Sequence, residues 1–261
     1  MHCPEMISIM LPEKKQKIYK AISVALALLL WQAGATALDS GLLLASPWEV
    51  LVRLTTLWRE PGFWSAVWFT FSRIVLGFLL AFVLGTGLGL LAGRWKGAEL
   101  FLWPYMLTIK TVPVASFIIL SLVFLKARQL SVFISFLMVL PVLYSNVLQG
   151  VKSTDKALLE MARVYRVPYG RRLLYIHLPH LKPFVLSGCS TALGLCWKAG
   201  VAAEVIAVTA DSIGGHLYDA KVYFMTADLL AWTVLIVLIS VTFEKLFLRL
   251  LKGAYALLEG R

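Results

Sequence analysis

The chain has 261 residues, of which 60% are hydrophobic and only 15% are charged. This composition excludes a soluble globular domain and indicates a single domain within a lipid bilayer. The net charge of +11 would suit nucleic-acid binding, but Lys and Arg gather at the ends of apolar segments, where they orient membrane helices, so we expect no nucleic-acid partner.

Six stretches of the chain are apolar and long enough to cross a bilayer, which takes about 20 residues. In chain order the expected spans cover about 18–38, 64–92, 100–125, 130–148, 183–208 and 229–248. We therefore predict an all-α integral membrane protein with six transmembrane helices. They form one domain over residues 1–261, in which a core of about 64–251 follows the first span.

Lys and Arg are distributed unequally between the two sides of this arrangement. The two termini and the second and fourth connections together carry 17 of them, whereas the other connections carry 5. Because cytoplasmic loops carry the excess of Lys and Arg, we predict that both termini are cytoplasmic.

The first apolar stretch has a rival interpretation as a cleavable signal peptide. Lysines precede it, and the run AGATA near its end contains the small residues typical of a cleavage site. Its removal would leave five spans and place the basic C-terminal end against the charge rule. We therefore expect the first helix to be retained.

The second stretch repeats glycine at every fourth position, at Gly85, Gly89 and Gly93. This spacing predicts that another helix packs closely against it. Gly87, Gly89 and Ala92 also match a dinucleotide-binding pattern, but no strand precedes them, so helix packing is the favoured interpretation.

Four ionisable residues lie inside the expected spans, namely Arg73, Lys110, Lys198 and Glu204. Charged side chains at membrane depth are costly, so each is a candidate for lining a translocation pathway; a structural ion pair or snorkelling is an equally open alternative. Pro113 follows Lys110 and is expected to break the third span, exposing polar backbone to the pathway. Lys198 and Glu204 are six residues apart and are not expected to pair.

The connection at about 150–180 is the most charged part of the chain. Ser153 or Thr154 can cap the start of a short amphipathic helix, whose dipole Asp155 complements. Leu158, Met161, Ala162 and Tyr165 share one face of this helix. Pro168 interrupts it, and a second short helix follows with Arg171 and Arg172 on its exposed side. Three partners are open for the apolar faces: the membrane surface, the rest of the chain, or another protein.

Catalytic and nucleotide-binding signatures do not occur in this sequence. It has no Walker A motif, no H-E-x-x-H, and no histidines at metal-ligand spacing. We expect a chain that is not an enzyme, binds no metal or cofactor, and draws any chemical energy from another subunit.

The 150–180 connection resembles the cytoplasmic loop of ATP-binding cassette importer permeases, written E-A-A, three residues, G, nine residues, I-x-L-P. Glu160, Met161 and Ala162 match its start, Arg166 stands at the glycine position, and the end is in register at Ile176, Leu178 and Pro179. The segments SPWEV, TFSRIVLGFLLAFVLGTGLGLLAG, TVPVASF and ALGLCWKAGVAAEVIA are similar to permeases of the nitrate, sulfonate and taurine importer group. The resemblance covers about 46–252.

The resemblance implies a permease subunit in the plasma membrane of a prokaryote. Its implied partners are a second permease copy, cytoplasmic ATPase subunits that use ATP and Mg²⁺, and an extracytoplasmic solute-binding protein. The loop between helices 4 and 5 would couple the ATPase to the spans. Glu160 would contact the ATPase, Ala162 would pack closely, and Ile176 with Leu178 would anchor the second helix.

Two loop residues depart from the motif of this group. Met161 replaces alanine, which an adaptable groove could accept because methionine is flexible. Arg166 replaces glycine, which tolerates positive φ values that strain arginine. Either the turn differs locally, or Arg166 pairs with an acidic group of the ATPase or is solvated.

The buried lysines give a modest preference for an anionic solute, such as a sulfonate or nitrate. Residues 211–226 are expected to face outside, where either a binding protein docks or a plain surface helix lies. The main rival function is a secondary transporter driven by an ion gradient, which would show internal repeats that we do not find. A membrane enzyme would need a cluster of catalytic groups, and a structural scaffold would not explain the ordered motif.

Overall fold

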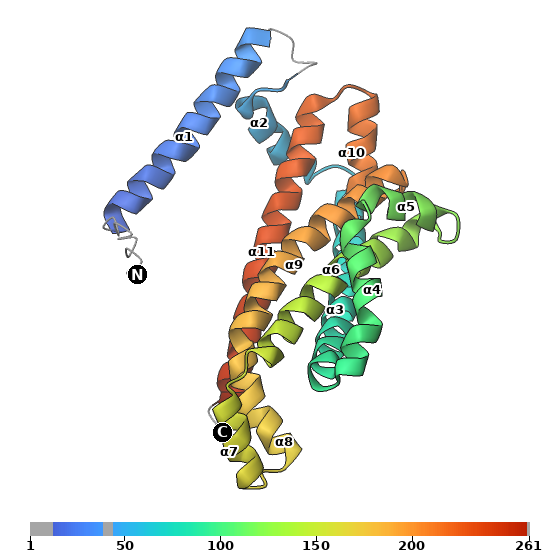
Figure 1. Ribbon diagram of the computed structural model, residues 1–261. Coiled ribbons are helices and arrows are strands. Elements are labelled where there is room, and N and C mark those ends of the chain that lie inside the picture. Colours follow the sequence, from blue (N-terminus) through green and yellow to red (C-terminus); the bar gives the residue numbers. More distant parts are fainter. Residues whose placement is uncertain (1–12, 39–43, 260–261) are drawn as a thin grey trace, which may run out of the picture.

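The computed structural model describes residues 13–38 and 44–259, and every regular element in these ranges is a helix (Figure 1). This confirms the predicted all-α class. The helices are α1 (Glu13–Leu38), α2 (Pro47–Leu57), α3 (Phe63–Arg94), α4 (Lys96–Thr111), α5 (Val114–Leu122), α6 (Ala127–Lys152), α7 (Lys156–Val164), α8 (Tyr169–Arg172), the π-helix η1 (Leu173–His177), α9 (Leu178–Ile206), α10 (Ile213–Val222) and α11 (Thr226–Glu259).

Three long helices, α3, α6 and α9, pack together at the centre, and α11 runs along α9 (Figure 1). Their facing sides bury one apolar cluster, which includes Phe78, Leu143, Leu193 and Trp197. By length and composition α3, α6 and the helical segment ending at Ile206 are able to cross a membrane. They coincide with the predicted second, fourth and fifth spans.

The predicted third span is broken. Helix α4 ends at Thr111, α5 begins at Val114, and the two are bent by 97° relative to one another. Pro113 lies at the bend because proline lacks an N–H group and cannot continue the hydrogen-bond ladder of α4. The expected break of the third span at Pro113 is thus confirmed. The pair counts as a fourth candidate span only if it is taken as one unit.

The remaining two windows fall within α1 and α11. In α1 the apolar helical stretch is Ala21–Ala37, which is shorter than a full span. The total of six spans, and the cytoplasmic position of the termini, stay predictions; residues 1–12 and 260–261 lie outside the described ranges.

Gly85, Gly89 and Gly93 of α3 face α6, as their spacing predicted. A Cβ atom added at Gly89 would lie 2.8 Å from Cβ of Val147, and one at Gly93 would lie 2.6 Å from Cγ1 of Val151. The stripe also extends to Gly77, where the added atom would lie 2.5 Å from the carbonyl oxygen of Val132. Small residues therefore let the two helices approach along most of their length.

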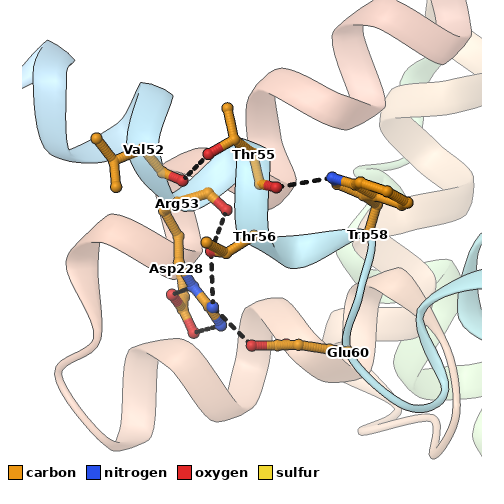
Figure 2. Close-up of polar contacts among 7 residues, drawn as sticks. All are labelled: Val52, Arg53, Thr55, Thr56, Trp58, Glu60 and Asp228. Atoms are coloured by element: carbon orange, nitrogen blue, oxygen red, sulfur yellow. Dashed lines mark hydrogen bonds and ion pairs between the residues drawn. The ribbon is translucent and has the colours of Figure 1, made fainter.

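A polar clamp holds α2 against the start of α11 (Figure 2). The guanidinium group of Arg53 donates two hydrogen bonds to Asp228, one of them 2.9 Å long from Nη2, and its Nη1 lies 2.6 Å from Oε1 of Glu60. The bonds to Asp228 raise the pKa of Arg53 above its ordinary value. Both side chains of the Arg53–Asp228 pair are mostly buried, so the clamp fixes α2 firmly.

Candidate functional site

The loop of helices α7, α8 and η1 lies at the opposite end of the molecule from α2 and α10 (Figure 1). The first predicted short helix is confirmed as α7, but its cap is Asp155 and not Ser153 or Thr154. The carboxylate of Asp155 accepts a 2.8 Å hydrogen bond from the N–H of Ala157. The chain then turns at Pro168, and α8 begins at Tyr169. The second predicted short helix is not separate, because α8 continues through η1 into α9 without a break.

The apolar side of α7 is partly buried against the rest of the chain and partly exposed. Ala162 is only 1% exposed, whereas Leu158 is 45%, Met161 51% and Tyr165 76% exposed. Val164, which the sequence pattern did not include, is 78% exposed. Ala162 thus seats the helix on its own chain, and the other four side chains form an open apolar surface, which we call the α7 surface.

Arg166 adopts the conformation that the motif glycine would adopt. Its φ angle is +48°, in the left-handed region. The N–H of Arg166 donates to the carbonyl of Arg163 at 3.0 Å, and the N–H of Val167 donates to that of Ala162 at 2.9 Å. These two bonds are the Schellman pattern that ends many helices. The turn is therefore kept despite the arginine, whose side chain is exposed.

Two pairs of side chains tie the loop to the spanning helices in contacts that the sequence did not predict. The hydroxyl of Thr154 lies 3.4 Å from Nδ1 of His177, and that of Ser153 lies 3.0 Å from Nε2 of His180. Both pairs join the end of α6 to the start of α9. They escaped notice because serine, threonine and histidine are common in solvated loops and carry no spacing signal.

Arg172 is not the exposed residue that the helical pattern predicted. It is half-buried, and its Nη2 donates to the carbonyl oxygens of Ala162 at 3.4 Å and Val167 at 3.3 Å. The Schellman turn leaves these carbonyl groups at the end of α7, where a guanidinium group can reach them. Arg172 therefore links α8 to α7, while Arg171 is exposed as expected.

The other motif residues lie on either side of this link. Glu160 is exposed on α7, and Pro179 is exposed in the first turn of α9. Ile176 and Leu178 are half-buried where η1 meets α9. This placement is compatible with an outer contact for Glu160 and with anchoring by the two apolar residues.

A polar stripe runs along the open side of α9. Ser187, Thr191, Gly194 and Lys198 recur at helical spacing, and all four are exposed or half-buried. Of these only Lys198 was singled out from the sequence, although the spacing of the hydroxyl residues was visible there. A polar stripe on an otherwise apolar helix marks a face turned away from lipid.

Lys110 and Pro113 are both exposed at the α4–α5 bend. The first turn of α5 packs through Val114 into the same apolar cluster as Ala199 and Ala202 of α9. Ala199 directly follows Lys198, and Ala202 lies about one helical turn after Lys198. The bend of the third span therefore lies beside the part of α9 that carries Lys198.

Glu204 is fully buried and is held by neighbours other than Lys198. Its Oε2 accepts hydrogen bonds from the hydroxyl of Thr70 at 2.8 Å and from the N–H of Gly214 at 3.2 Å. These contacts join α9 to α3 and to the start of α10. The prediction that Lys198 and Glu204 do not pair is confirmed.

Arg73 turns toward the start of α6. Its Nε donates to the carbonyl oxygen of Arg128 at 2.5 Å, and its guanidinium group lies 3.6 Å from the centre of the Phe69 ring. Arg73 thus makes no contact with Lys110 at the bend or with Lys198 on α9.

No group of His, Cys, Asp and Glu side chains suited to a metal ion occurs among the described residues.

Comparison with known proteins identifies the class to which this architecture belongs. Residues 81–252 match the model of the binding-protein-dependent transport system inner membrane component family. The chain belongs to this family. The match includes the loop, the polar stripe and the α4–α5 bend, so the permease fold and membrane location follow, as does the expectation of ATPase and binding-protein partners.

Several curated relatives are ABC transporter permeases of similar length. The putative aliphatic sulfonates transport permease SsuC of Bacillus subtilis is 27% identical, over 87% of this chain and 83% of its own. The taurine transport permease TauC of Escherichia coli is 27% identical, over 89% and 87%. The nitrate import permease NrtB of Synechocystis is 26% identical, over 78% and 76%. The chain is therefore an ABC transporter permease of this group.

Proposed function

We propose that this permease forms the solute pathway of an ATP-driven importer and that its α7–α8 loop couples the pathway to a cytoplasmic ATPase. The observation that carries the proposal is the α7 surface. Four apolar side chains on one short helix stay open while Ala162 of the same helix is buried. Exposed apolar patches mark contacts with a protein or with a membrane, and the importer-permease motif of this loop favours a protein partner.

The contacts of the loop suit the transmission of a rigid-body movement. Arg172 joins α8 to the end of α7, and the Thr154–His177 and Ser153–His180 pairs join the loop to α6 and α9. A push on the α7 surface would therefore move the spanning helices with the loop. ATP and Mg²⁺ would be bound and used by the ATPase, and this chain would bind neither.

The proposed topology has six spans, α1, α3, the α4–α5 pair, α6, α9 and α11, with both termini and the α7–α8 loop in the cytoplasm. The excess of Lys and Arg on that side supports it. Helices α2 and α10 would then face outside, where a solute-binding protein docks. The location is the plasma membrane of a prokaryote.

A second copy of the chain would complete the permease. Helix α1 stands apart from the other helices in Figure 1 and touches mainly α2, and its described side chains are largely exposed. A helix placed in this way is free to pack on a neighbouring copy. The polar stripe of α9 likewise needs a polar environment, which a shared pathway between two copies would supply.

The pathway we propose passes the polar stripe and the α4–α5 bend. Lys198 and Lys110 would attract a small anionic solute, and the hydroxyl groups of Ser187 and Thr191 would donate hydrogen bonds to it. Relatives are named for the transport of sulfonates, nitrate and taurine, which supports a solute of this kind. Glu204 lies outside this set because its contacts are structural.

The test of coupling is a double substitution on the α7 surface, Leu158→Glu with Val164→Glu. We expect loss of co-purification with the ATPase, because two carboxylates would be desolvated at the interface. Leu257→Glu is the matched control, since Leu257 is 77% exposed near the C-terminal end of α11. Retained ATPase binding by the double variant would contradict the proposal.

The energy source separates this function from its rival, a secondary transporter. Proteoliposomes that contain the permease and its ATPase are supplied with the solute-loaded binding protein. Solute uptake should then require ATP on the side of the membrane where the ATPase lies. It should persist when ionophores collapse the ion gradients. Uptake that follows the gradients without ATP would instead favour the secondary transporter.

A further inference from the structure

An apolar groove lies on the outer side of α3 and α6. It has a volume of about 560 Å³ and is lined almost entirely by apolar side chains. Leu76, Leu80 and Leu84 of α3 form one wall at helical spacing, and Val132, Phe133 and Phe136 of α6 contribute to the other. The three leucines are each 45–50% exposed, so the groove is open.

Positive charge gathers at one end of this groove. Arg73 belongs to the same stripe of α3 as the three leucines, and it reaches Arg128 in the first turn of α6. The two guanidinium groups lie 3.6 and 5.7 Å from the centre of one ring, that of Phe69. Asp211 faces Arg128 at 3.5 Å, with both side chains well exposed. Arg128 thus has one weak, exposed carboxylate partner, and among the described residues Arg73 has no carboxylate within ion-pair distance.

The backbone adds to this positive potential. Helix α6 begins at Ala127 with Lys126 as its N-cap, and no side chain caps the helix there. The free N–H groups of a helix start carry partial positive charge. Glu204, the other nearby carboxylate, is buried behind α3 and is held by Thr70 and Gly214. The end of the groove is therefore suited to an anionic group.

The dimensions of the groove match one leaflet of a bilayer. From Arg73 to Leu84 the rise along α3 is about 16 Å, since each residue of a helix adds about 1.5 Å. Half of the hydrocarbon core is about 15 Å thick. Arg128 lies just before the predicted fourth span of about 130–148, so its side chain is expected near the lipid headgroups.

We propose that this groove is a binding site for an anionic phospholipid. The phosphodiester headgroup would be held by Arg128 and Arg73, and one acyl chain would lie along Leu76, Leu80 and Leu84. Arginine suits this role because its planar group binds phosphate oxygens in pairs. The site is separate from the α7 surface and the polar stripe, so it does not depend on the proposed transport function.

The test uses the full-length chain in a neutral detergent, with dioleoylphosphatidylglycerol as the probe and dioleoylphosphatidylcholine as the neutral comparison. Native mass spectrometry measures retained lipid. Arg128→Gln should weaken phosphatidylglycerol binding about fivefold, as expected for one surface arginine, without affecting phosphatidylcholine. Arg59→Gln is the matched control, because Arg59 is exposed and lies over Trp58 instead.

A second variant tests the groove itself. Leu80→Trp should fill it and reduce retention of phosphatidylglycerol, whereas Leu79→Trp, at an exposed position outside the groove, should not. Glycerol 1-phosphate, which has no acyl chain, should bind far more weakly than the lipid. Equal retention of both lipids by the wild type would overturn the proposal. So would a Leu80→Trp variant that loses self-association but keeps its lipid, because the groove would then be a contact between copies.

Discussion

Three helices of this permease end on a residue other than glycine in the left-handed conformation. Arg166, Val208 and Phe224 have φ values of +48°, +47° and +55°. The same two backbone hydrogen bonds occur at each of these turns. At Arg166, for example, its N–H donates to the carbonyl of Arg163, and the N–H of Val167 donates to the carbonyl of Ala162. Strain in single residues is therefore tolerated wherever two backbone bonds and the next helix fix the turn.

Arg166→Gly should stabilise the permease. The left-handed conformation costs an L-residue about 1–2 kcal/mol, and the greater freedom of glycine in the unfolded chain offsets about 0.5–1 kcal/mol of that gain. A net gain of up to about 1 kcal/mol corresponds to a rise of about 2–4 °C in the thermal unfolding midpoint. Arg163→Gly within α7 is the control and should lower the midpoint, because its backbone is helical. If both variants lose stability equally, the arginine side chain outweighs the strain.

Substituting alanine for each of two glycines of α3 is expected to have opposite effects on stability. Gly89→Ala should lower the free energy of unfolding by about 1–3 kcal/mol, because the new methyl group would meet Val147 at 2.8 Å. Gly87→Ala should be neutral or stabilising, since an added Cβ there meets no described atom within 4 Å and alanine favours helix. Unfolding in detergent, followed by circular dichroism, measures both. Equal effects would mean that α3 and α6 do not depend on their close approach.

At the scale of the element, the sequence predicts what depends on local chemistry and misses what depends on tertiary contacts. The break at Pro113 and the glycine face of α3 follow from proline and from small-residue spacing. The burial of Arg172 could not be predicted, because helical periodicity places it outward and only the end of α7 draws it in.

The same limit applies to the candidate site. The motif located the coupling loop, but four of the side chains that fix it to the spans are ordinary serine, threonine and histidine residues. The split of the α7 face, with Ala162 inward and Tyr165 outward, depends on which helices lie beneath it. The charge of Lys198 inside an apolar span identified it from the sequence. Ser187 and Thr191 are common residues in membrane helices, so they become candidates only because they share a helix face with Lys198.

The clamp of Figure 2 is expected to decide the stability of α2. Arg53→Ala removes three interactions and leaves Asp228 mostly buried without its partner, so we expect a loss of about 1.5–3 kcal/mol. Arg59→Ala, an exposed arginine six residues later, should change stability by less than about 0.5 kcal/mol. Because the pKa of Arg53 is raised, its contribution is complete below its ordinary pKa and should not vary between about pH 6 and pH 9. A strong pH dependence over that range would assign the stability of α2 to other groups.

At the scale of the whole molecule, the permease separates three surfaces by position. Helix α7 lies at one end, α2 and α10 lie at the other, and α9 runs between them (Figure 1). The polar stripe lies on α9. The proposed pathway follows this stripe and so passes Lys198, and α5, which follows the α4–α5 bend near Lys110, packs in the same apolar cluster as Ala199 of α9. The proposed transport function requires these lysines to act on the solute and not on folding.

Lys198→Met is the prediction that tests this arrangement. Methionine keeps the length and apolar stem of lysine but removes its charge, so an anionic solute would lose a charge-assisted hydrogen bond of about 1.5–3 kcal/mol. Uptake by proteoliposomes with the ATPase and binding protein should then need at least about tenfold more solute for half-maximal rate. Lys110→Met should act in the same direction, whereas Lys96→Met, at an exposed position at the start of α4, should not. Assembly with the ATPase should be unchanged in all three variants. Lys198→Arg should restore most of the uptake if charge is what matters, and unaltered kinetics in both Lys198→Met and Lys110→Met would remove the two lysines from the pathway.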